Sequence, residues 1–224
     1  QLWRGNYAEC ARGGREAMAS FEPRSTGWYV ALGHLATASG SLGDSDALSE
    51  LAALIADQPD EPSPARDVAA CRLAVVLLRA GEREKTDALV QLVKGSPHAE
   101  EHSLVCAWRE VLFAELASQS GDVSRYLAHS EAATEHFTFA GDVRNACLQR
   151  HNVGNALMLL GAYQRAEIVF REVLDLAEPV QLNLVPGAQD QGEDVSAGRV
   201  GQAGVINLLP SGPEIDKITG AAPN

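Results

Sequence analysis

The spacing of apolar residues between His151 and Pro179 predicts two antiparallel helices joined by a tight turn. Apolar side chains recur there at intervals of three and four residues, which places them on one face of each helix. The first face holds Val153, Ala156, Leu157 and Leu160, and the second holds Ala166, Phe170, Val173 and Leu174. Gly161 lies between them, where a left-handed cap would end the first helix. Pro179 would stop the second helix, because proline has no backbone N–H.

Glycines recur along the chain at nearly constant intervals. The intervals are 38, 38, 40 and 40 residues, and the glycines are Gly5, Gly43, Gly81, Gly121 and Gly161. A helix breaker follows each one 16 to 20 residues later, namely Pro23, Pro59, Pro97, Gly141 and Pro179. A glycine turn, a helix, a breaker and another helix make one hairpin. Because such a period is typical of helical repeats, we expect an all-α solenoid of antiparallel hairpins with a period of 38–40 residues.

This pattern divides the chain into a repeat domain, residues 1–178, and a tail, residues 179–224. The first repeat is incomplete, because residues 1–4 are too short for a helix and only the helix at 7–21 remains. Hairpins are expected at 25–57, at 65–94, from Ser96 to 139 and at 143–179. Ser96 and Pro97 are typical of a helix start and are expected to open the fourth hairpin. The tail holds seven glycines and five prolines, which is typical of disorder, so we expect a linker or a truncated or altered sequence there.

The last hairpin resembles the tetratricopeptide repeat, whose pattern is W-x2-L-G-x2-Y, then A-x3-F, then P. The matching residues are Arg150, Val153, Gly154, Leu157, Ala166, Phe170 and Pro179. Gly154 and Ala166 are small where two close helices need small residues. The resemblance implies a right-handed solenoid that binds proteins or peptides. The stretch from Phe139 to Asn155 is similar to the repeat regions of large bacterial signalling proteins, such as Ser/Thr protein kinases, signalling ATPases and cyclases.

The resemblance also implies a binding surface. In this family the first helix of each hairpin lines a concave groove, and its sixth and ninth positions often hold a peptide backbone. Those positions are Asn152 and Asn155 in the last hairpin, Leu112 and Glu115 in the one before, and Arg72 and Val75 in the third. The set of Lys, Asn and Arg that clamps a carboxylate in some members is not reproduced.

Six residues are therefore the candidate partner-binding set on the concave face: Asn152, Asn155, His151, Arg72, Arg79 and Glu115. Arg72 and Arg79 are seven residues apart on one helical face and could meet an acidic partner. The alternatives are that the arginines are simply solvated and that the asparagines serve packing and capping.

Charge and motifs exclude several classes of function. The formal net charge is −12, which opposes binding to nucleic acid. No run of about 18 apolar residues predicts a membrane span, and no signal peptide opens the chain, so we expect a cytoplasmic segment with four reduced cysteines. The sequence has no phosphate-binding loop, no G-x-S-x-G elbow and no kinase signature. We therefore expect a non-catalytic interaction module without a cofactor, possessing any kinase or ATPase domain only upstream in a larger protein.

Two alternatives stay open. His98, Glu101 and His102 match H-x-x-E-H, an inverted zinc-protease pattern, and on one helix the two histidines would be a turn apart. A zinc enzyme or a small-ligand sensor would use them, whereas the simpler interpretation is a solvated helix start with acidic residues in its first turn. The other alternative is a scaffold that self-associates through the uncapped ends of its repeats.

Overall fold

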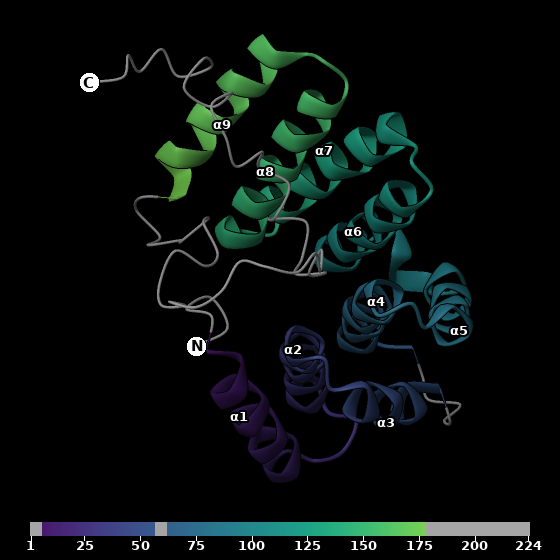
Figure 1. Ribbon diagram of the computed structural model, residues 1–224. Helices are drawn as coiled ribbons and strands as arrows, with labels where there is room; N and C mark the ends of the chain where they lie inside the picture. The colour runs from purple at the N-terminus through teal and green to yellow at the C-terminus, as the bar shows by residue number, and fades with distance from the viewer. Residues whose placement is uncertain (1–5, 57–61, 178–224) are drawn as a thin grey trace, which may run out of the picture.

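The computed structural model describes residues 6–56 and 62–177, and all regular structure in these ranges is helical (Figure 1). The predicted all-α class is confirmed for them. Gly5, most of the loop at 58–64, Pro179 and the tail at 179–224 lie outside the described residues. The helices are α1 (Tyr7–Ser20), α2 (Thr26–Leu42), α3 (Ser45–Ala56), α4 (Pro64–Arg79), α5 (Arg83–Lys94), the 3₁₀ helix η2 (Pro97–Ala99), α6 (Ser103–Gln119), α7 (Val123–Phe139), α8 (Val143–Leu159) and α9 (Tyr163–Ala177).

Glycine ends five of these helices in the way that the sequence predicts. The backbone is left-handed, with φ between +70° and +82°, at Gly43, Gly81, Gly121, Gly141 and Gly161. At the α6–α7 turn, the Gly121 N–H donates to the Ser118 carbonyl at 3.1 Å, and the Asp122 N–H donates to the Ala117 carbonyl at 2.9 Å. Only glycine adopts this conformation without strain, so it closes the helix.

The residue after the glycine opens the next helix. The Asp122 carboxylate accepts the Arg125 N–H at 3.0 Å and so caps α7. Asp44 and Asp142 cap their helices in the same way, through Ala47 and Asn145. One Gly-Asp pair therefore ends one helix and starts the next within three residues.

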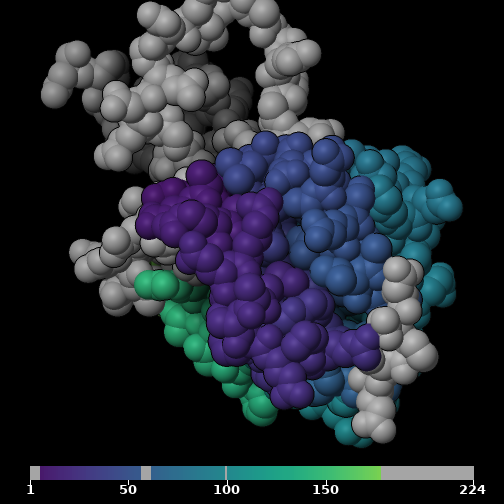
Figure 2. All heavy atoms as spheres, turned by 90° about the horizontal axis from the view of Figure 1, so that it is seen from below, coloured from purple at the N-terminus to yellow at the C-terminus, as the bar shows by residue number. Residues whose placement is uncertain are grey.

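The helices form a row in their first half and a succession in their second. Helix α2 packs against α1 and α4, and α4 packs against α6 (Figure 1). Helices α3 and α5 lie on one side of this row, against α2 and α4. From α6 onward each helix packs against the one before it and the one after it, through α7 and α8 to α9. In Figure 2, α1 and the helices that follow it, coloured purple to blue, form most of the visible face.

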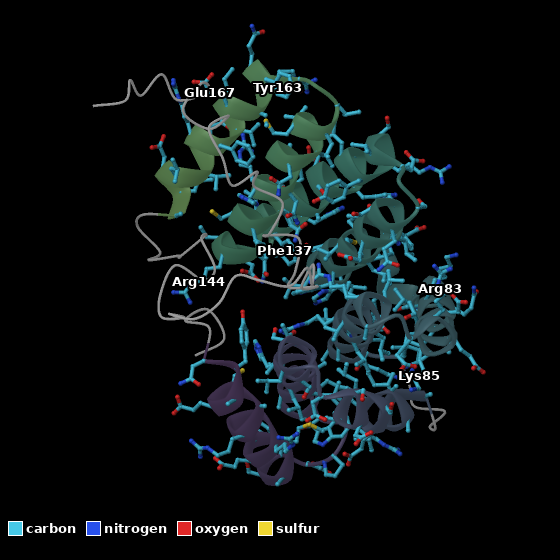
Figure 3. The ribbon with its side chains drawn as sticks, viewed as in Figure 1. Arg83, Lys85, Phe137, Arg144, Tyr163 and Glu167 are labelled. Carbon is cyan, nitrogen blue, oxygen red and sulfur yellow. The ribbon has the colours of Figure 1, made fainter. Side chains whose placement is uncertain are left out.

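A single large apolar cluster extends from α1 to α8. Its most buried large side chains come from different helices and include Leu32, Leu73, Leu112 and Phe137, each with no exposed surface. Figure 3 shows Phe137 in the interior and Arg83 at the periphery, pointing outward. Gly154 lies so close to Phe170 that a Cβ there would be 2.5 Å from the ring, which confirms the need for a small residue.

Two residues of the predicted apolar faces are exposed. Leu160 is 46% exposed because it is the last residue before the Gly161 turn, beyond the helix itself. Leu174 is 66% exposed. Helix α9 packs mainly against α8, and it does so through Ala166, Val173 and Ala177, so the adjacent residue Leu174 points away from α8.

The close packing of α2 on α4 gives a test with a matched control. A Cβ at Gly40 would lie 2.2 Å from Cγ1 of Val76, whereas a Cβ at Gly13 in α1 would meet nothing within 4 Å. We expect Gly40→Ala to lower the free energy of unfolding by about 1–3 kcal/mol, since valine cannot easily rotate away. Gly13→Ala should raise it by about 0.5–1 kcal/mol through helix propensity alone. Urea denaturation measures both changes, and a Gly40→Ala protein as stable as Gly13→Ala would contradict the close approach.

Candidate functional site

A groove of about 370 Å³ lies between α2, α4 and the start of α6. We call it the α2–α4 groove. Its walls are Thr26, Tyr29, Val30 and Gly33 from α2, Ser63, Pro64, Ala65, Val68, Ala69 and Arg72 from α4 and its cap, and His102 and Leu104 at the start of α6. Val30 is 49% exposed, so the groove offers apolar surface to solvent.

Two equivalent helical stripes build this groove. In α2 the lining residues Thr26 to Gly33 occur at positions i, i+3, i+4 and i+7, and in α4 the residues Ala65 to Arg72 occur at the same positions. The stripes are 39 residues apart, which is the period of the glycines. Sequence reasoning missed the groove because it followed the neighbouring stripe of Trp28, Leu32 and Leu35, which is buried in the core. The repetition of a second, mixed stripe at the glycine period was the available signal.

Arg72 has the most unusual environment among the groove residues. It is only 9% exposed, and its guanidinium lies 5.0 Å from the centre of the Trp108 ring. Its Nη2 donates to the Thr37 hydroxyl at 3.1 Å and contacts Nδ1 of His34 at 3.2 Å. A Cβ at Gly33 would lie 3.2 Å from Cδ of Arg72, so the arginine lies directly across the glycine.

The charges around Arg72 can be assigned. Burial, and then the charge of Arg72, lower the pKa of His34 to about 4, so its ring is neutral at pH 7. Since arginine only donates, Nδ1 of His34 is the acceptor. Burial lowers the pKa of Arg72 to about 10, which leaves it a cation at pH 7. A buried positive charge thus faces neutral hydrogen-bond partners.

Arg79 and Glu115, two more of the predicted partner-binding residues, pair with each other across α4 and α6. Nη2 and Nε of Arg79 donate to Oε2 of Glu115 at 2.7 and 3.0 Å, and the Glu115 side chain is 8% exposed. The Tyr126 hydroxyl is buried without a hydrogen-bond partner, and burial, followed by the charge of Glu115, raises its pKa. The acidic group that Arg79 meets is therefore part of the same chain.

The predicted residues of α8 form a separate cluster. Nδ2 of Asn155 lies 3.3 Å from Nδ1 of His151, and Nδ2 of Asn152 donates to Gln149 at 3.1 Å. All three predicted residues are buried, and burial lowers the pKa of His151. The six candidate residues thus lie in three places: the α2–α4 groove, the Arg79–Glu115 pair and the α8 cluster. Their role in partner binding stays a prediction.

The segment from Ser96 to His102 differs from the expected helix start. Ser96 does cap a helix that begins with Pro97, but this is the 3₁₀ helix η2, and α6 begins only at Ser103. The reason is a contact with α4: Nδ1 of His98 lies 3.0 Å from the Asp67 carboxylate, and the Ser96 hydroxyl donates to the same oxygen. His98 and His102 consequently do not share one α-helical face.

These contacts also define what the segment can do chemically. In a catalytic triad the serine and the carboxylate bind opposite ring nitrogens. Here Ser96 and Asp67 both lie on the Nδ1 side of His98, so the histidine cannot relay a proton between them. Among residues 6–56 and 62–177, no three His, Cys, Asp or Glu side chains lie close enough to hold a metal ion.

Comparisons with known proteins add no relative. None of the described helices is both long and apolar enough to cross a membrane. No family model matches the chain, and neither curated proteins nor solved structures include a match.

Proposed function

We propose that the chain is a non-catalytic protein-interaction module and that its α2–α4 groove binds a segment of another protein. The observation that carries this proposal is the pair of equivalent stripes, which line one concave, partly apolar surface with Val30, Val68 and Leu104 around a single buried cation. Protein-binding clefts combine an apolar lining with a few placed polar groups in this way.

We also propose that the helices pair as hairpins and stack as a right-handed solenoid of the tetratricopeptide type. The glycine period of 38–40 residues, the left-handed turns and the row formed by α2, α4 and α6 support this arrangement. In such a stack, the first helices of successive hairpins line the concave face, and α2, α4 and α6 are those helices. A regulatory or sensing region of a larger cytoplasmic bacterial signalling protein, such as a Ser/Thr kinase, is the parent that this proposal favours.

Peptide selection on the purified chain tests the groove. Peptides that bind would be selected from a random library, and their affinities measured for the wild type and for Val30→Glu. We expect Val30→Glu to weaken binding at least about tenfold, or about 1.4 kcal/mol, because a charged side chain replaces apolar surface inside the groove. Val30 is exposed, so the substitution leaves the core intact.

Leu54→Glu is the matched control. Leu54 is 42% exposed on α3 and does not line the groove. The control should bind the selected peptides as the wild type does. Equal affinities for all three proteins would overturn the proposed site, and so would a library that yields no binder.

A further inference from the structure

Arg72 is a buried cation without an ion pair. No carboxylate of the described residues lies within ion-pair distance of it, and its Nε is buried without a hydrogen-bond partner. Its two hydrogen-bonding partners, Thr37 and neutral His34, both use Nη2. Asp142 is near enough to raise its pKa, but the Asp142 carboxylate accepts the Asn145 backbone N–H and side-chain amide instead. Removing a charge from water is costly unless a counter-charge compensates it.

The surroundings hold this cation in place rather than neutralise it. The Trp108 ring lies beneath the guanidinium and attracts it through the ring electrons. Gly33 leaves room for the side chain on the other helix, because any Cβ there would press on Cδ and Nη1 of Arg72. A side chain held by stacking and by neutral hydrogen bonds is already ordered before a ligand binds, so little further entropy is lost on binding.

The same end of the groove is electropositive for a second reason. Helices α2 and α4 both begin there, after the caps Ser25 and Ser63, and their first turns contribute Thr26 and Ala65 to the lining. The amino-terminal end of a helix carries a partial positive charge. Together with Arg72, these two helix ends favour a negatively charged group in a groove whose other walls are apolar.

We propose that the α2–α4 groove recognises an acidic side chain, Asp or Glu, of the bound segment, and that this carboxylate pairs with Arg72. The proposal rests on the function proposed above. Apolar neighbours of the acidic residue would contact Val30, Val68 and Leu104. A guanidinium binds a carboxylate through charge-assisted hydrogen bonds, and exclusion of water by the apolar walls strengthens the pair.

Paired peptides test the proposal. Selected peptides with an amidated C-terminus would be compared with versions in which each Glu is replaced by Gln. We expect the wild type to prefer the Glu form at least about tenfold, and Arg72→Met, checked for helicity by circular dichroism, to bind both forms equally. Equal binding of both forms by the wild type would overturn the acidic-residue proposal, even where Val30→Glu still abolishes binding and the proposed function stands. A requirement for a free terminal carboxylate would overturn it as well.

A measurement on the wild type keeps the proposal testable if Arg72→Met does not fold or no peptide is found. The Nε–Hε resonance of Arg72 in ¹⁵N-labelled protein would be followed as sodium acetate is added, against sodium chloride at equal ionic strength. We expect a saturable shift with acetate that is absent with chloride. Identical responses to the two salts would show that Arg72 does not bind carboxylates.

Discussion

Phe137→Ala will lower the free energy of unfolding by about 3–5 kcal/mol. The Phe137 side chain has no exposed surface and contacts the Trp108 ring edge to face, with centroids 5.5 Å apart and planes at 87°. It lies near the end of α7 and joins that helix to α6, so its removal leaves a cavity between two helices that cannot close without moving one of them. Urea denaturation monitored by circular dichroism gives the change.

Phe139→Ala is the control for this substitution, because Phe139 is on the same helix but 84% exposed. It should change the free energy of unfolding by no more than about 0.5 kcal/mol. Similar losses for the two variants would contradict the placement of α7. Since Trp108 also stacks on Arg72, we further expect Phe137→Ala to weaken the binding of acidic peptides more than that of their Gln forms.

Arg79→Met will have the second largest effect, a loss of about 2–4 kcal/mol. The substitution leaves Glu115, whose side chain is 8% exposed, without its counter-charge beside the buried hydroxyl of Tyr126. Breaking a buried ion pair from one side is costly because the remaining charge stays desolvated, whereas removing both charges costs much less. The double variant Arg79→Met with Glu115→Gln should therefore recover most of the loss.

Arg12→Met provides the comparison with an exposed pair. Arg12 and Glu16 are 64% and 65% exposed, so their ion pair is screened by water and its loss should cost at most about 0.5 kcal/mol. Thermal denaturation of the four proteins separates the two situations. A double variant less stable than Arg79→Met would mean that the pair is not a buried one.

Local features of the fold could be predicted from single residues. A left-handed turn selects glycine so strongly that Gly43, Gly81, Gly121 and Gly161 could be placed from sequence alone, and the helices between them followed. A following aspartate marks three helix starts as clearly, because it caps the first turn. These choices depend on the backbone of a few neighbouring residues and on nothing distant.

The rest depends on which helices become neighbours, and periodicity does not contain that information. Leu174 belongs to an apolar stripe, yet it is exposed because α9 packs mainly against one helix. Ser96 and Pro97 start a 3₁₀ turn, because Asp67, 29 residues earlier than Ser96, binds the Ser96 hydroxyl. Arg72 was recognised as a candidate, but its stacking on Trp108 and its lack of a counter-charge arise only when α2, α4 and α6 lie side by side.

The central claim is that the α2–α4 groove is the surface to which a partner segment binds. Methyl-group NMR of the full chain, with and without a selected peptide, tests this claim most directly. We predict that the largest shifts occur at Val30, Val68 and Leu104, which line the groove, while Leu54 on α3 and Ile168 and Leu174 on α9 stay unchanged. Largest shifts on α3 or α9, with the groove methyl groups unmoved, would contradict the claim.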